Sequence, residues 1–214
     1  MTAARADIRP FQPSDLDAVY AIALATGDAG KDASALYEDP QLVGHIYAAP
    51  YALLEPDCAF VVEDAEGVGG YIVGTADTRR FDARLEAEWW PALRKRYGAP
   101  AFRPATWSAD EQRAWLIHNP FLTPEHIVAS HPAHLHINLL PRLQGRELGR
   151  RMLDRFLAAV KLTGAPGVHL GCSTANSRAL RFYDAYGFTE LERSTRMTTV
   201  WMGFALPDAG NHAA

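Results

Sequence analysis

The sequence has only two cysteines, Cys58 and Cys172, and both lie within apolar stretches of strand character. Two such residues cannot form the disulfide framework of a small secreted domain, so we expect both thiols to be reduced and buried. The chain also lacks an apolar run near the roughly 18 residues that a membrane-spanning helix needs. Its first residues lack the apolar segment of a secretory signal peptide. These absences predict a cytoplasmic protein with no membrane partner.

Net positive charge is missing as well, because the formal charge of the 214 residues is -4. Proteins that bind nucleic acid through a broad electrostatic surface usually carry a strong positive charge, so we expect no nucleic-acid partner. Any polyanion site must therefore be local. No internal repeat or low-complexity segment interrupts the chain, and its length suits one domain with an insertion. The oligomeric state is left open, including a homodimer.

Strand and helix signals meet in the stretch from His134 to Leu153. Apolar and polar residues alternate up to Pro141, which predicts a strand that stops there, because proline cannot donate a ladder hydrogen bond. From Leu148 to Val160, apolar residues recur at helical spacing, and Gly164 follows as a stop signal. The rest of the chain is organised around this strand and helix.

Three arginines, Arg146, Arg150 and Arg151, stand near the predicted start of this helix, where the helix dipole disfavours cations. A bound polyanion would reverse that preference, because free backbone N–H groups and guanidinium groups together form a phosphate site. The alternative is that the arginines extend into water and Glu147 balances their charge. The local pattern alone leaves both interpretations open.

The remaining patterns predict a mixed sheet flanked by helices, with a mostly helical insertion at 80–131. Within the insertion, Pro91 is expected to kink a helix or to divide it into two short helices, and Ser108 is expected to cap a helix. Pro50 is expected to end an earlier helix. The expected strands are 8–11, 58–63, 68–75, 134–140, 168–172, 188–192 and 196–206. The expected helices begin near residues 15, 36 or 42, 82, 108, 148 and 176.

Several short motifs of the chain occur in a recognisable order. They are Ile8-Arg-Pro-Phe with Asp15, the hairpin at 58–77, Gln144-Gly-Arg-Glu-Leu-Gly149 after a strand ending in Leu-Leu-Pro, and Asn176-Ser-Arg-Ala179 with Phe182-Tyr183 and Gly187-Phe188. Together they resemble the GCN5-related N-acetyltransferase (GNAT) superfamily. Segments within 36–97 further resemble the acetyltransferase-like domain of animal O-GlcNAcase and its free-standing bacterial relatives. We therefore expect a single domain over 1–207 and a tail at 208–214.

The resemblance implies an α/β (α+β) GNAT fold whose mostly antiparallel sheet is splayed between the strands at 134–140 and 168–172. Acetyl-CoA would lie in that opening as the co-substrate, without a metal. The loop amides would hold the pyrophosphate, Leu139 and Leu140 would pair with pantetheine, and Asn176 would hydrogen-bond the pantetheine arm. The residues expected to bind the cofactor are Leu139, Leu140, Gln144, Gly145, Arg146, Glu147, Leu148, Gly149, Arg150, Arg151, Asn176, Ala179 and Tyr183.

One residue departs from the family pattern, which expects glycine where this chain has Glu147. A carboxylate about 4 Å from a phosphate charge costs on the order of 4 kcal/mol at an effective dielectric near 20. The arginines could offset that repulsion. The departure keeps an alternative open, in which the chain is a catalytically weak or inactive acyl-CoA-binding pseudo-acetyltransferase or an interaction domain.

Acetyl transfer needs an acid for the departing thiolate, and the resemblance gives Tyr183 this role, with a core tyrosine as the alternative. Asp77, His136 and Asn138 are the candidates on the acceptor side. His136 titrates near neutrality, Asp77 could contact the amine or cap a helix, and the amide of Asn138 can only position substrate or water. We predict an N-acetyltransferase that moves acetyl from acetyl-CoA to an unidentified primary amine by direct attack. The histidine spacing fits no standard metal site.

Overall fold

The structure is a computed structural model that describes residues 6–194 and 198–207. Among these residues, one seven-stranded sheet has the order β1-β2-β3-β4-β5-β7-β6. Its strands are β1 (Asp7–Pro10), β2 (Ala59–Asp64), β3 (Gly67–Thr75), β4 (Ala133–Leu139), β5 (Gly167–Ser173), β6 (Thr189–Arg193) and β7 (Thr199–Ala205). Neighbouring strands are antiparallel except β4 and β5, which are parallel. The predicted mixed, mostly antiparallel sheet is therefore confirmed. The expected tail at 208–214 and residues 196–197 lie outside the described residues.

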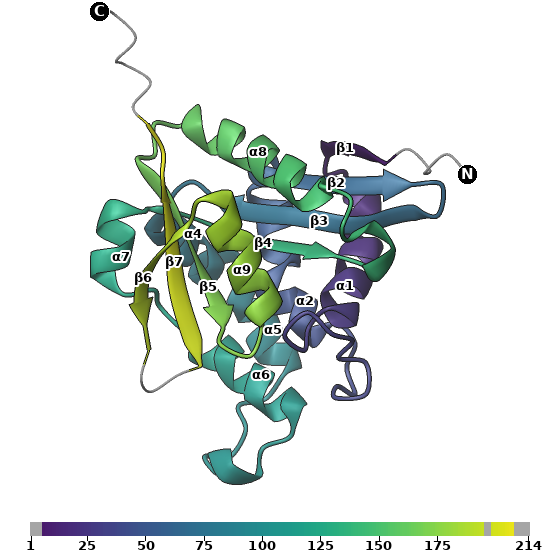
Figure 1. The fold of residues 1–214 in the computed structure, drawn as a ribbon. Helices are drawn as coiled ribbons and strands as arrows, with labels where there is room; N and C mark the ends of the chain where they lie inside the picture. Colours follow the sequence, from purple (N-terminus) through teal and green to yellow (C-terminus); the bar gives the residue numbers. More distant parts are fainter. Residues whose placement is uncertain (1–5, 195–197, 208–214) are drawn as a thin grey trace, which may run out of the picture.

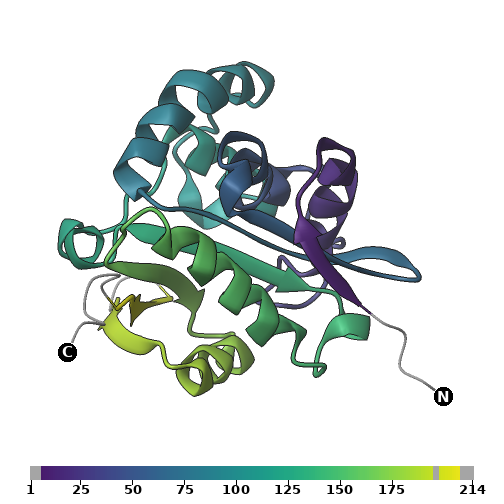
Figure 2. The same ribbon diagram turned by 90° about the horizontal axis from the view of Figure 1, so that it is seen from above.

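Helices cover both faces of the sheet, as Figure 2 shows with α8 in green on one side and α1 in purple on the other. The α-helices are α1 (Leu16–Ala25), α2 (Leu42–Tyr47), α3 (Ala49–Leu54), α4 (Thr78–Arg84), α5 (Trp90–Arg96), α6 (Ala109–His118), α7 (Glu125–Ser130), α8 (Leu148–Lys161) and α9 (Ser177–Tyr186). Helices α4 to α7 all fall between β3 and β4 in the chain. In the described part of the chain, no helix has the length and apolar character that a membrane crossing requires.

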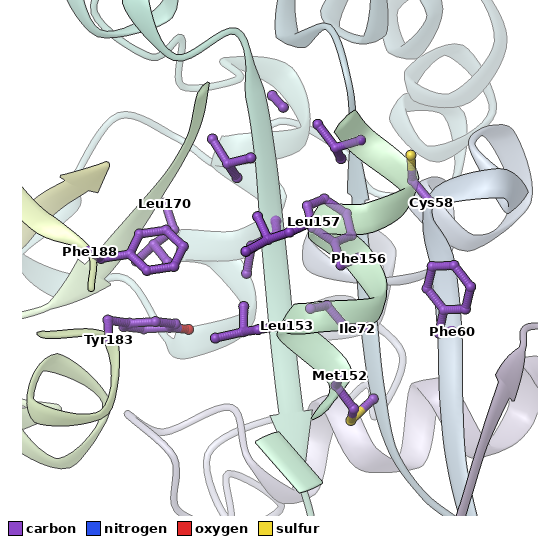
Figure 3. Packing of buried hydrophobic residues seen from close by; sticks show 14 of the residues in the cluster. Cys58, Phe60, Ile72, Met152, Leu153, Phe156, Leu157, Leu170, Tyr183 and Phe188 are labelled. Carbon is purple, nitrogen blue, oxygen red and sulfur yellow. The ribbon is translucent and has the colours of Figure 1, made fainter. Parts of the chain in front are cut away.

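The central helix α8 buries a continuous apolar face. Met152, Leu153, Phe156 and Val160 are fully buried, because residues three and four apart lie on the same side of a helix. Figure 3 shows this face lying between Ile72 and Phe60 on one side and Leu170 and Phe188 on the other. Burying one such side chain contributes roughly 1.5–3 kcal/mol, so α8 holds the two halves of the sheet together.

Strand β4 separates two chemical environments through its period-two alternation. Leu135, Ile137 and Leu139 belong to the cluster packed around α8. The alternate residues point to the opposite face, where His134 and His136 contact Tyr51 of α3. The strand that the sequence predicts as central therefore presents an apolar face to α8 and a histidine-rich face to the helices between β1 and β4.

The sheet splits where β4 meets β5. Their parallel pairing covers only Ala133 with Val168 and His134 with His169, whereas β4 pairs with β3 along 134–139. Figure 1 shows β5 and β7 turned away from the direction of β2, β3 and β4. Beyond His134, the edge of β4 that faces β5 has no strand partner among the described residues. This is the splay that the resemblance implies.

One of two prolines acts differently from the local prediction. Pro50 lies in the first turn of α3 and does not end a helix. Pro91 lies in the first turn of α5, after a π-helical turn at Leu85–Trp89 that follows α4, so the predicted division into two short helices is confirmed. Proline is tolerated in a first helical turn because the N–H groups there have no partner within the helix. Ser108 caps α6 as predicted, and its hydroxyl accepts from Glu111 N at 3.2 Å.

Candidate active site

The loop between β4 and α8 carries backbone donors that lack acceptors. After a 3₁₀ turn at Pro141–Leu143, Gly145 and Glu147 have φ of 71° and 58°, and Arg151 N makes the first helical bond, to Glu147 O at 3.1 Å. Within residues 6–194 and 198–207, no acceptor is found for the N–H groups of Gly145, Glu147, Leu148, Gly149 and Arg150. Such a cluster at a helix N-terminus binds anions, and phosphate in particular.

Gln144 bridges the opening below this loop. Its Nε2 donates to the carbonyl oxygen of Leu139 at 2.7 Å, and its Oε1 accepts from Arg178 of α9. The side chain therefore connects the end of β4 to the helix that follows β5. Leu148 is buried beneath the loop, and a Cβ placed on Gly149 would lie 3.1 Å from Phe182. The loop consequently sits close against α9.

Of the two leucines expected to pair with pantetheine, only one faces the opening. Leu140 donates its N–H to Gly69 O at 2.8 Å, so it belongs to the ladder with β3. Because N–H groups of successive strand residues point to opposite edges, the N–H of Leu139 points toward β5. The N–H of Leu140 is already used within the protein, because the pairing of β3 and β4 continues one residue beyond the strand.

The predicted arginines do not converge on the loop. Arg150 lies 5.0 Å from the centre of the Tyr186 ring and reaches Ala185 O at 3.4 Å. Arg151 is exposed, and Arg146 interacts electrostatically with Asp64. The backbone of Arg150 thus belongs to the donor cluster, while its guanidinium lies against α9.

Glu147 occupies the position where the family pattern has glycine. Its left-handed conformation is one that glycine adopts freely and that costs other residues roughly 1–2 kcal/mol. The side chain is exposed and forms no hydrogen bond or ion pair with the described residues. Glu147 therefore brings both backbone strain and an uncompensated negative charge to the loop.

Tyr183 lies on the buried face of α9. Its ring packs at 5.3 Å from Phe182 and 5.5 Å from Phe188, and Figure 3 shows its hydroxyl pointing toward Leu153 and β4. Burial, and to a lesser extent the nearby Cys172 thiol, raises the pKa of Tyr183 far above its ordinary value. The phenol is therefore protonated at neutral pH.

The predicted pantetheine ligand Asn176 is also a helix cap. Its Oδ1 accepts from the N–H of Ala179 at 3.1 Å at the start of α9. The carbonyl of the side chain is thus committed to the helix. Its amide nitrogen makes no hydrogen bond with the described residues and remains available to a ligand.

A cavity of about 830 Å³ opens on the other side of the sheet. Its wall combines parts of β4, β5, α2, α3, α4 and α6 that lie far apart in the sequence. The side chains that line the cavity include Tyr47, Tyr51, Asp82, Trp90, Arg113, Phe121, His136, His169, Cys172 and Trp201. Because Gly171, Cys172 and Ser173 of β5 also line it, the cavity extends to the region where β4 and β5 separate.

A chain of hydrogen bonds fixes the tautomer of His136. Thr78 Oγ1 donates to Pro132 O at 2.6 Å, so it accepts from Nδ1 of His134 at 2.7 Å. His134 Nε2 then accepts from the Tyr51 hydroxyl at 2.9 Å, and the Tyr51 oxygen accepts from His136 Nε2 at 3.3 Å. This assignment leaves a lone pair on His136 Nδ1, which has no partner among the described residues.

His136 is therefore an uncharged group that borders the cavity. Burial, with a smaller effect from His169, lowers its pKa to about 4. Burial likewise holds the pKa of His134 well below its ordinary value. Both rings are neutral at pH 7, as the hydrogen-bond chain requires.

The other two acceptor-side candidates do not line the cavity. Asp77 is exposed and caps α4, where its Oδ1 accepts from Arg80 N at 3.0 Å. Asn138 donates through Nδ2 to Thr26 Oγ1 at 2.5 Å, which anchors β4 to α1. Of the three candidates, only His136 lines the cavity.

Several cavity residues have no signal in the sequence. Tyr51, Thr78, Asp82 and Arg113 lie in helices whose local patterns indicate only helix formation, and they meet only through the fold. Among the described residues, no group of three or more His, Cys, Asp or Glu is arranged to hold a metal ion.

Residues 6–188 match the acetyltransferase (GNAT) family. Two curated relatives, both named Protein O-GlcNAcase and from Rattus norvegicus and Mus musculus, are 25% identical over 186 residues. That region is 87% of this chain but 20% of each relative, so the chain spans about a fifth of their length.

The crystal structure of SsHAT is 42% identical, with a TM-score of 0.86 over 94% of this chain and 98% of that one. The structure of yncA from Salmonella typhimurium with its cofactor acetyl-CoA has the same fold, with a TM-score of 0.55 over 98% and 96% of the two chains at 15% identity. The splayed sheet and its flanking helices are thus shared with proteins that differ in most residues. The predicted family is confirmed: the chain belongs to the GNAT acetyltransferases, a family that uses acetyl-CoA.

Proposed function

We propose that this chain, as one domain over 1–207 with a helical insertion at 80–131, transfers acetyl from acetyl-CoA to a primary amine by direct attack. The divergence of β4 and β5 after His134 carries the proposal. It leaves an opening with unpaired backbone donors on the α8 side and the cavity on the side of the insertion. One substrate can enter from each side and meet the other between the strands.

The α8 side fits the co-substrate. The N–H groups of Gly145 and of residues 147–150, which have no acceptor among the described residues, suit a diphosphate, and the free N–H of Leu139 suits the carbonyl groups of the pantetheine arm. The amide nitrogen of Asn176 adds a donor at the start of α9, and Gln144 holds Leu139 in place. When bound, acetyl-CoA supplies an acetyl group activated as a thioester.

Tyr183 would donate its phenolic proton to the sulfur of the departing thiolate. Its raised pKa keeps the proton on the phenol until a strong base forms nearby. The ring is held by Phe182 and Phe188, so the hydroxyl keeps a fixed direction toward β4.

His136 would take the proton from the acceptor amine at Nδ1. An imidazole with a pKa near 4 is a weak base, so it acts once the nitrogen has begun to bond and its protons have become acidic. The hydrogen bonds through Tyr51, His134 and Thr78 then spread the positive charge toward the carbonyl of Pro132. Asn138 would support the site by fixing β4 to α1, and Asp77 would support it by capping α4.

The test combines turnover and binding. The purified chain is incubated with acetyl-CoA and a panel of primary amines, and free thiol is measured. Calorimetry with acetyl-CoA is run in parallel on the same folded protein. We expect both binding and thiol release. Binding without release for any amine would favour the alternative of an inactive acyl-CoA-binding pseudo-acetyltransferase, and absence of binding would refute both.

A further inference from the structure

We infer that Arg113 is an anion-binding group of the acceptor cavity, and that the acceptor is a small amine that also carries a carboxylate, such as an amino acid. The inference builds on the proposed function and adds the chemical class of its acceptor. Arg113 belongs to α6 and lines the same cavity as His136 and Cys172.

The guanidinium of Arg113 is held by aromatic rings. Its central carbon lies 5.8 Å from the centre of the Tyr37 ring and 5.6 Å from that of Tyr47. The Nε atom is buried and has no hydrogen-bond partner among the described residues. Aromatic faces stabilise a guanidinium and fix its plane. The hydroxyl of Tyr37 also interacts with the guanidinium as a hydrogen-bond partner. The group is therefore oriented, and its Nε donor remains unused.

The acidic residues of the cavity form no ion pair with Arg113. Asp82 pairs with Arg79 at 3.1 Å, and Glu86 pairs with Arg94 at 2.7 Å. The third, Asp28, forms no ion pair within the described residues. No ion pair involves Arg113 within the residues that the structure describes. An unpaired, half-buried charge is unfavourable in a protein unless a ligand supplies the counterion. A carboxylate does so best, because it accepts two parallel bonds from a guanidinium.

Arg113 and His136 both lie beside Tyr47. The Arg113 carbon and the His136 ring lie 5.6 Å and 5.7 Å from the centre of the same Tyr47 ring. An amine near His136 Nδ1 and a carboxylate at Arg113 can therefore belong to one small molecule. Cavities of 300–1,000 Å³ hold small ligands, and this one, at about 830 Å³, leaves room for a side group against Trp90 and Phe121.

The test compares acceptors that differ only in the carboxylate. Phenylalanine and phenethylamine are assayed with acetyl-CoA in the full chain and in Arg113→Gln. We expect the unmodified protein to use phenylalanine at least about tenfold better in kcat/KM, since a charged hydrogen-bond pair contributes that much. Arg113→Gln should remove this preference and change the rate with phenethylamine less than threefold.

Arg155→Gln is the matched control. Arg155 lies over the Phe60 ring at 5.5 Å, so its replacement also removes an arginine from an aromatic face, but it is on α8 and does not line the cavity. This variant should keep the full preference for phenylalanine. Equal use of the two acceptors by the unmodified protein, or a preference that survives in Arg113→Gln, would overturn the inference.

A binding measurement separates this inference from the proposed function. Calorimetry in the presence of CoA compares N-acetylphenylalanine with N-acetylphenethylamine, and needs no turnover. We expect at least tenfold tighter binding of the carboxylate, abolished in Arg113→Gln. Equal affinities would refute the role of Arg113. Turnover of no amine, together with a carboxylate preference in binding, would refute the proposed transfer and support the anion-binding role.

Discussion

The two sides of the opening between β4 and β5 are built in different ways. On the α8 side, the proposed binding groups are mainly backbone N–H donors between Leu139 and Arg150. On the insertion side, the cavity wall consists of side chains from at least six separate elements. Backbone donors depend on loop conformation and tolerate many sequences, whereas a side-chain cavity changes whenever one residue changes. The first side therefore suits an invariant ligand such as a diphosphate, and the second would determine which acceptor enters.

The largest effect on kcat is expected for Tyr183, which is proposed to act where the two substrates meet. Tyr183→Phe should lower kcat by roughly a thousandfold, because general acid catalysis contributes between a hundredfold and ten-thousandfold. KM for acetyl-CoA should change little, since the phenol is proposed to act on the leaving group. Steady-state kinetics give both constants, and a thermal melt should match that of the unmodified protein, because the hydroxyl makes no hydrogen bond within the described residues. An unchanged kcat would remove Tyr183 as the acid.

The second-largest effect on kcat is expected from a residue that lines the cavity. His136→Gln should lower kcat by roughly a hundredfold, because glutamine keeps a polar group but cannot take a proton. Calorimetry should show unaltered affinity for acetyl-CoA, which separates the two sides. The control is His126→Gln, since His126 is exposed and pairs with Glu192 at 2.7 Å outside the cavity. A fall in acetyl-CoA affinity in His136→Gln would contradict the division proposed between the two sides.

Stability should depend on pH partly through two histidines that line the cavity. Burial lowers the pKa of His136 and His169 to about 4, whereas both titrate near 6.5 when unfolded. Below pH 6.5 the unfolded chain binds protons that the folded chain excludes, so these two groups lower the free energy of unfolding between pH 6.5 and 4 and their contribution is constant below that range. We expect the melting temperature to drop by more than about 5 °C between pH 7 and 4.5.

The same titration in His136→Gln tests the source of that slope. Removing one buried histidine should make the fall in melting temperature shallower. Identical slopes in the two proteins would assign the acid sensitivity to other groups.

The sequence predicted the α8 side better than the cavity side. The strand, Pro141, the loop and the helix from Leu148 are encoded within about twenty residues, so their order alone indicates the site. The sequence did not reveal that Leu140 pairs with Gly69 or that Arg150 lies against Tyr186, because each contact joins segments that are distant in the chain.

The cavity side depends almost wholly on such distant contacts. His136 was a candidate because it shares a strand face with Asn138, but nothing in the sequence connects it to Tyr51 or Thr78. Arg113 looks like an ordinary polar residue of an amphipathic helix until α6 is packed against α2. Local periodicity identifies elements, and only their packing brings together residues from separate elements.

The smallest expected effect returns to the loop, where one residue breaks the backbone character of the α8 side. Glu147→Gly removes a carboxylate from the donor cluster and replaces a residue with φ of 58° by one that adopts this conformation freely. We expect acetyl-CoA to bind roughly threefold to tenfold more tightly by calorimetry, because an exposed charge is largely screened by water. The melting temperature should change by only a few degrees, since the relief of strain and the flexibility of glycine in the unfolded chain oppose each other.

Glu147→Gln separates the charge from the strain. Glutamine removes the charge and keeps a side chain at the position with φ of 58°, so this variant alters the electrostatics of the loop without relieving its backbone strain. Tighter acetyl-CoA binding in both Glu147→Gly and Glu147→Gln would show that the carboxylate itself weakens the diphosphate site. Weaker binding in Glu147→Gly would mean that Glu147 holds the loop in its binding conformation, and that this side of the opening depends on a side chain after all.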